Sequence, residues 1–172
     1  MSTQTGLQIA SLYLNSPLGT IRISGTTQAI NEVHFLEDAE IQHPDNVERP
    51  AFDLIVECRR QLLEYFKGNL KHFDIRVDQP GTGFQQKVWQ QLSVIRYGDT
   101  ISYLSLARNL GDQKVIRAAA AANGRNNVAI IIPCHRVIGN SGDLVGYAGG
   151  VWRKKWLIEH EKKFAHGVRT LF

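Results

Sequence analysis

The 172-residue chain has little cysteine, little proline and no long apolar run. Two cysteines, Cys58 and Cys134, are too few for the disulfide framework of a small secreted domain, and without a CxxC pair they argue against a thiolate zinc site. No apolar stretch approaches the roughly 18 residues that a membrane-spanning helix needs. The first residues, MSTQTGLQ, lack the basic start and apolar core of a signal peptide. We therefore expect a cytoplasmic protein with free thiols, no membrane association, and no metal or other cofactor.

Negative charge is scarce in the second half of the chain. Residues 1–78 carry 7 Lys and Arg against 11 Asp and Glu, whereas residues 79–172 carry 13 against 5. Such an asymmetry is common in soluble proteins, but it is also typical of a half that binds phosphate groups. Together with the linker-like sequence DQPGTG, it indicates two parts that meet near residue 80.

The first part has the pattern of a small α+β unit. Three strand-length pieces, LQIASLYL, GTIRISG and AINEVHFL, are separated by turn sequences and predict a three-stranded antiparallel sheet. From Pro50 to Gly68 the apolar period becomes helical, which predicts one helix and places Cys58 on or near its buried face. The segment KHFDIRV, residues 71–77, is expected to add a strand.

The second part is expected to be mostly helical. FQQKVWQQLSVI has apolar residues at helical spacing, and Ser102 and Asp112 are suitable N-caps for two short helices separated by Gly111. Two short helices joined by a tight turn form the helix-turn-helix pattern. The second of them carries Lys114 and Arg117 before five alanines, which would let its backbone approach DNA closely. Because alanine is also the best helix former, this signal is weak by itself.

The last third of the chain is expected to form short strands in AIIIPC, HRVIG and LVGYAGG, followed by a helix over VWRKKWLIEHEKKF. One of these strands would end at Cys134, next to His135. A cysteine attacks as its thiolate, so it needs a neighbour that lowers its pKa or removes its proton. His135 is a candidate base, and Glu161 lies where it can orient the imidazole ring. A Cys-His pair alone says little, because a cysteine is more often a buried filler than a nucleophile.

The wider context of Cys134 is more specific. The segment NNVAIIIPCHRVIGNSGDLVGYAGGVWRKKWLIEHE, with PCHRV and GYAGG, closely resembles the active-site region of the O6-alkylguanine-DNA alkyltransferases, a family of single-turnover DNA-repair enzymes. FQQKVWQQL, ISYLSLA and KVIRAAAAANGRN resemble the same family in order and spacing. The resemblance implies an α+β fold with two domains. Residues 1–80 would form a ribonuclease-H-like supporting domain, and residues 81–172 a mostly helical domain with the helix-turn-helix and the active site.

The resemblance also implies a reaction. Cys134 would take the alkyl group from O6-alkylguanine, and from O4-alkylthymine, in a base flipped out of the duplex, forming a thioether once per molecule. His135 would take the thiol proton through a water, with Glu161 orienting the ring. Asn126 would brace the turn before the active site by hydrogen bonds to backbone groups. Tyr103 would donate a proton toward guanine N3, so that the base does not leave with full negative charge.

The partner implied by the resemblance is double-stranded DNA, bound by a monomer through the minor groove without sequence preference. Arg117 would fill the gap that the flipped base leaves in the stack. Further DNA contacts are expected from Lys114, Ala118, Ala121 and Arg125. The substrate pocket would be lined by backbone groups of Cys134 and Val137 and by Tyr147 and Ala148.

Two other functions are compatible with parts of the sequence. A non-catalytic protein that recognises alkyl lesions through the helix-turn-helix would also bind DNA, but such relatives carry another residue, typically tryptophan, in place of Cys134. A thiol hydrolase using Cys134 and His135 would leave the helix-turn-helix and the basic half unexplained. The sequence departs from the family at Gly83 and Asn127, where proline is usual, and at Ala119-Ala120, where Val-Gly is common.

Overall fold

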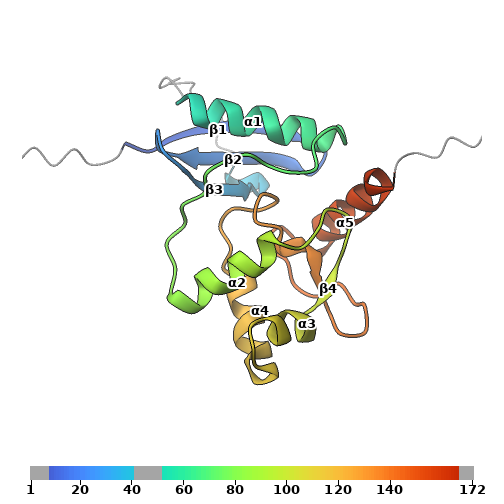
Figure 1. Ribbon diagram of the computed structural model, residues 1–172. Coiled ribbons are helices and arrows are strands. Elements are labelled where there is room, and N and C mark those ends of the chain that lie inside the picture. The colour runs from blue at the N-terminus through green and yellow to red at the C-terminus, as the bar shows by residue number, and fades with distance from the viewer. Residues whose placement is uncertain (1–7, 41–51, 167–172) are drawn as a thin grey trace, which may run out of the picture.

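The computed structural model describes residues 8–40 and 52–166. An antiparallel sheet with one helix on its face is followed by a mostly helical part, so the fold class is α+β, as the sequence predicts (Figure 1). The sheet has the strand order β1-β2-β3. The elements of this first part are β1 (Ala10–Ser16), β2 (Gly19–Gly25), β3 (Ile30–Phe35), the 3-10 turn η1 (Asp38–Glu40) and α1 (Asp53–Phe66).

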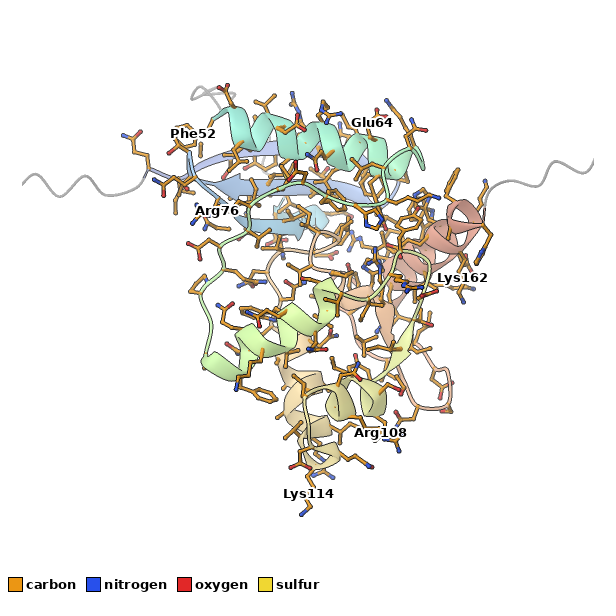
Figure 2. The ribbon with its side chains drawn as sticks, viewed as in Figure 1. Phe52, Glu64, Arg76, Arg108, Lys114 and Lys162 are labelled. Atoms are coloured by element: carbon orange, nitrogen blue, oxygen red, sulfur yellow. The ribbon has the colours of Figure 1, made fainter. Side chains whose placement is uncertain are left out.

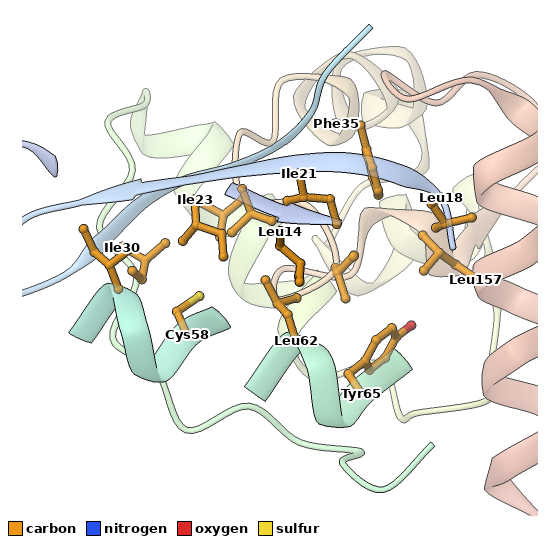
Figure 3. Close-up of a cluster of buried hydrophobic side chains, with 14 of the residues drawn as sticks. Leu14, Leu18, Ile21, Ile23, Ile30, Phe35, Cys58, Leu62, Tyr65 and Leu157 are labelled. Atoms are coloured by element: carbon orange, nitrogen blue, oxygen red, sulfur yellow. The ribbon is translucent and has the colours of Figure 1, made fainter. Parts of the chain in front are cut away.

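The core of the first part lies between the sheet and α1. Apolar side chains alternate along β1 and β2, and a register shift in β3 places Ile30 and Val33 three residues apart. One face of the sheet is therefore apolar, and α1 covers this face (Figure 3). Helical spacing places Cys58, Leu62 and Tyr65 on the covering side of α1, where all three are fully buried. Cys58 is therefore a core residue, as predicted, and burial raises the pKa of its thiol to about 12.

The second part is a compact arrangement of short helices. Thr82 begins α2 with a capping box to Gln85, and the predicted N-caps Ser102 and Asp112 accept hydrogen bonds from Ser105 N and Lys114 N. The elements are α2 (Gly83–Ser93), β4 (Ile101–Ser102), α3 (Tyr103–Asn109), η2 (Gln113–Val115), α4 (Ile116–Gly124), η3 (Cys134–Arg136), β5 (Val137–Ile138) and α5 (Val151–Ala165). None of the helices within residues 8–40 and 52–166 combines the length and the apolar character needed to cross a membrane.

Three of the predicted strands do not form: KHFDIRV, AIIIPC and LVGYAGG. Residues 71–77 contribute only an isolated bridge between Val77 and Ile30, because the backbone of this segment finds other partners. The N–H of Asp74, for example, donates to Oε1 of Gln61 on α1 at 2.9 Å. LVGYAGG is an irregular loop, and HRVIG supplies only the two-residue β5, which pairs in parallel with β4.

We expect the two neighbouring leucines of α1 to differ sharply in their effect on stability. Leu62 is fully buried in the core, whereas Leu63 is 39% exposed. Leu62→Ala should lower the free energy of unfolding by about 2–5 kcal/mol, since it leaves a cavity, and Leu63→Ala by less than about 1 kcal/mol. Urea titration of both variants measures the difference. Equal losses would show that α1 does not cover the sheet through this face.

Candidate active site

Cys134 begins η3, a 3-10 helix of one turn. The sequence had placed this cysteine at the end of a strand, and that prediction is wrong. Ile130 has a φ angle of +70°, which turns the chain within the apolar run. The N–H groups of Ile131 and Cys134 each donate to the carbonyl two residues back, at 2.8 Å. These local bonds use the donors that a strand would share with its neighbour, and Pro133 has no N–H to contribute. The cysteine is therefore carried on a tight turn.

Cys134 lines a pocket of about 150 Å³ between α3, α4 and the loop that precedes α5. Four of the residues predicted for the site, Tyr103, Asn126, Tyr147 and Ala148, line it too. Val137 is not part of the lining and its side chain is fully buried in the core of the second part, so a contact through its backbone stays a prediction. The complete lining is Tyr103, Ala120, Asn123, Gly124, Asn126, Cys134, Gly146, Tyr147 and Ala148.

Asn126 connects the thiol to the backbone around it. Its Nδ2 donates to Sγ of Cys134 at 3.2 Å and to the carbonyl of Ile132 at 2.8 Å, while its Oδ1 accepts from the N–H of Val128 at 3.1 Å. The backbone bonds are the ones expected from the sequence, and the bond to sulfur is an addition. A donor aimed at sulfur stabilises the thiolate relative to the thiol.

The electrostatic surroundings of Cys134 act in opposite directions. Burial raises the pKa of the thiol, whereas the Asn126 amide, the Lys154 ammonium and the backbone N–H groups of Cys134 and His135 lower it. Because burial has the larger effect, the net pKa is raised, and the thiol holds its proton at neutral pH. Nucleophilic attack at this pH therefore needs a base.

His135 has the geometry of such a base. Its ring is fully buried, and Nε2 lies 2.7 Å from Oε1 of Glu161. A carboxylate only accepts, so Nε2 carries the hydrogen and Nδ1 the lone pair. Within the described part of the chain, Nδ1 has no hydrogen-bond partner, which leaves it available to receive a proton.

Glu161 is itself held by a set of buried donors. The guanidinium of Arg136 donates to it through Nε at 2.8 Å and Nη2 at 3.0 Å, and Tyr65 OH donates to Oε1 at 2.8 Å. Burial favours the neutral carboxyl, but His135 and Arg136 together hold the pKa of Glu161 well below its usual range. Because Arg136 balances the carboxylate charge, burial dominates at the imidazole and lowers the pKa of His135.

Tyr103 lies on the pocket wall with its hydroxyl free to donate. The hydroxyl oxygen accepts from Nδ2 of Asn123 at 3.4 Å, so its own hydrogen can point elsewhere. Burial raises the pKa of Tyr103, which keeps the phenol protonated at neutral pH. Lys154, fully buried, lies 5.7 Å from the centre of the Tyr103 ring.

The surface of α4 carries the side chains predicted to contact DNA. Exposed positions on and around this helix are occupied by Lys114, Arg117, Ala118, Ala121 and Arg125. Lys114 and Arg108 mark the end of the molecule that lies farthest from the sheet (Figure 2). A groove of about 450 Å³ adjoins the cysteine pocket, and Arg117 lines it. It shares Tyr103, Ala120 and Gly146 with the pocket, which connects the helix surface to the thiol.

Several site residues were missed by sequence reasoning. Lys154 and Tyr65 carry periodic signals, because Lys154 lies two helical turns before Glu161 and Tyr65 continues the buried face of α1. Lys154 Nζ donates to the carbonyls of Val145 and Gly146, which fixes the pocket loop. Arg136, Asn123 and Gln79 had no such signal. No group of three or more His, Cys, Asp or Glu side chains suited to a metal occurs within residues 8–40 and 52–166.

Comparison with known families identifies the chain. Residues 9–79 match the ribonuclease-like domain of 6-O-methylguanine DNA methyltransferase, and residues 83–163 match the DNA binding domain of the same family. The chain belongs to the 6-O-methylguanine DNA methyltransferase family. This confirms the relationship that the PCHRV and GYAGG sequences indicated.

Curated and structural relatives agree with the family. The methylated-DNA--protein-cysteine methyltransferase of Methanosarcina acetivorans is 44% identical over 148 residues, 85% of this chain and 94% of the relative. That of Mycobacterium bovis is 42% identical over 163 residues, 92% and 96% of the two chains. A crystal structure of Mycobacterium tuberculosis O6-methylguanine methyltransferase superposes with a TM-score of 0.79 at 39% identity, covering 90% of this chain and 93% of that one. A crystal structure of Mycobacterium tuberculosis OGT in complex with DNA superposes with a TM-score of 0.78 at 41% identity, covering 88% of this chain and 92% of that one.

The buried imidazole of His135 should make stability depend on pH. Its pKa in the folded protein is below the value of about 6.5 in an unfolded chain, so the unfolded chain binds the proton more readily. Acidification from about pH 7 to about pH 5 should therefore lower the free energy of unfolding, by at most about 1.4 kcal/mol per pH unit from this group.

His135→Gln should flatten this pH dependence, because glutamine does not titrate. Urea titrations at several pH values measure the slope, and His72→Gln, at an exposed position, is the matched control that should keep the wild-type slope. A steeper slope in His135→Gln would mean that Glu161 raises the pKa of the imidazole above its unfolded value.

Proposed function

We propose that this protein repairs DNA by direct reversal, transferring the alkyl group of O6-alkylguanine to Cys134 in a single turnover. The observation that carries this proposal is the thiol of Cys134 in a pocket, next to a neutral His135 that Glu161 orients. The names of the relatives and the match to the family's DNA binding domain support the same reaction. O4-alkylthymine is proposed as a second substrate of the same chemistry.

The described residues account for each bond and proton of the transfer. The Sγ of Cys134 attacks the alkyl carbon, the bond from that carbon to O6 breaks, and a thioether forms. The thiol proton passes through a water to Nδ1 of His135, whose positive charge Glu161 stabilises. Tyr103 donates toward guanine N3, which lets the base leave without full negative charge. A thioether is not hydrolysed easily, so the protein reacts once.

Access to the pocket requires that the base leave the duplex. A guanine stacked between its neighbours presents O6 in the major groove and cannot enter a pocket between α4 and the loop before α5. We propose that α4 enters the minor groove, where exposed Ala118 and Ala121 permit close approach and Arg117 fills the vacated space. Lys114 and Arg125 would contact phosphates, which makes binding independent of sequence. One copy of the chain carries all of these groups, so we propose a monomer.

We further propose that residues 1–80 form a supporting domain and residues 81–172 the domain that binds DNA and reacts. The support would be direct, because Tyr65 of α1 donates to the carboxylate that orients His135. Recognition of lesions without repair is the alternative function. A free cysteine that lines the pocket beside an acid-base pair is unnecessary for recognition alone, so the structure favours the enzyme.

Alkyl transfer can be measured directly as a modification of the protein. Incubation with duplex DNA that contains O6-methylguanine should add one methyl group to the peptide with Cys134, measured by mass spectrometry. Cys134→Ala should bind the same DNA without reacting, and Cys58→Ala should still react, since Cys58 lies in the core with a pKa of about 12. DNA binding with an unmodified Cys134 peptide would favour the recognition protein.

The role of Arg117 can be separated from the chemistry. Arg117→Ala should slow methyl transfer from duplex DNA by about tenfold or more, because the flipped state loses its replacement in the stack, which costs at least about 1.4 kcal/mol. Transfer from the free base O6-methylguanine should be nearly unchanged. Arg76→Ala, an exposed arginine beside the sheet, is the matched control and should affect neither substrate (Figure 2). Equal losses on both substrates in Arg117→Ala would contradict the proposed role.

A further inference from the structure

Gln79 lies outside the pocket but contacts Asn126, whose amide donates a hydrogen bond to the thiol of Cys134. It is 4% exposed, at the end of the segment that leads into α2, and Gln86 Nε2 donates to its backbone carbonyl at 2.7 Å. Its side chain makes two further hydrogen bonds. Nε2 donates to Oδ1 of Asn126 at 2.9 Å, and Oε1 accepts from the N–H of Asn127 at 2.9 Å.

These contacts determine which way the two amide groups point. A side-chain amide can exchange its oxygen and nitrogen by a half-turn, but a backbone N–H is always a donor. The N–H of Asn127 therefore requires Oε1 of Gln79 on its side and leaves Nε2 to face Asn126. A donor at that position favours Oδ1 of Asn126, and two backbone groups, the N–H of Val128 and the carbonyl of Ile132, favour the same orientation. Nδ2 of Asn126 is then directed at Sγ of Cys134.

The direction of the Asn126 amide matters for the reaction. With Nδ2 toward sulfur, the amide donates to the thiolate that attacks the alkyl carbon. In the reversed orientation, the lone pairs of Oδ1 would face the negative sulfur and oppose its formation. We propose that Gln79 is a positioning residue for alkyl transfer, which holds the Asn126 amide with its N–H group toward Cys134. This inference rests on the function proposed above.

The other titratable groups around the thiol do not depend on Gln79. They are His135, which follows Cys134 in the chain, Tyr103 of α3, Tyr147 of the pocket loop, and Lys154 of α5. None of them is hydrogen-bonded to Gln79 in the described structure, so their effects should be the same in variants at this position. A change in the pH dependence of the reaction then reports on the Asn126 amide.

Two substitutions distinguish orientation from packing. Gln79→Leu removes both hydrogen bonds, and should slow single-turnover methyl transfer at neutral pH by about three- to tenfold. The pH at which Gln79→Leu reaches half of its maximal rate should be higher than that of wild type by about half a unit to one unit. In alkali the rate of the variant should approach the wild-type rate. Gln79→Glu keeps an acceptor for Asn127 N–H but faces Asn126 with a second acceptor. It should therefore oppose the orientation of the amide that the Val128 N–H and the Ile132 carbonyl favour, and react more slowly than Gln79→Leu.

The measurement is the rate of methylation of Cys134 by duplex DNA with O6-methylguanine, from neutral to alkaline pH. Gln90→Leu, at an exposed position of α2, is the matched control and should keep the wild-type rate. If Gln79→Leu does not fold, the nearly isosteric Gln79→Glu is compared with wild type directly. A Glu variant that reacts like wild type, or faster than Gln79→Leu, overturns the inference, since packing or satisfaction of Asn127 alone would give that order. Wild-type protein that leaves Cys134 unmodified overturns the proposed function, and this inference with it.

Discussion

The buried carboxylate of Glu161 is the interaction on which the rest of the site depends. It accepts hydrogen bonds from the imidazole of His135, the guanidinium of Arg136, the hydroxyl of Tyr65 and the N–H of Gly98. A buried charge is tolerated only with such a full set of donors, and removal of one donor leaves part of the carboxylate charge uncompensated. The reactive turn, the sheet-covering helix and the chain before β4 are therefore held to one point on α5. This single anion both orients the imidazole of His135 and joins the two halves of the molecule.

The elements that the sequence predicted correctly are those whose signals are local. Alternation predicted the three strands, helical spacing predicted α1 and α5, and cap residues placed α3 through Ser102. The prediction failed for KHFDIRV and AIIIPC, where β-branched residues suggest strands. There the backbone donors are taken by Gln61 or by carbonyls two residues back, and tertiary contacts override propensity.

The residues of the site also divide into those with a recognisable signal in the sequence and those without one. Cys134, His135 and Glu161 were predicted because PCHRV and the final helix carry them in a recognisable pattern, and the structure brings His135 and Glu161 into contact. Gln79 and Tyr65 lie 47 and 96 residues from the side chains that they contact, and no periodicity connects residues so far apart. Val137 was assigned to the pocket through its backbone; its side chain lies in the core, and the strand pairing with Ile101 that accompanies this had no signal in the sequence. Contacts between distant segments decide such details.

The enclosure of the Cys134 sulfur, with its proton retained, has a consequence for how the protein is used up. A molecule that reacts irreversibly has one opportunity, and any small electrophile in solution that reached a free thiolate would waste it. In the proposed mechanism, a protonated, shielded sulfur is a poor target for such reagents until an alkylated base occupies the pocket. Burial therefore preserves repair capacity, at the cost of a slower intrinsic nucleophile, and ties consumption of the protein to the presence of damage.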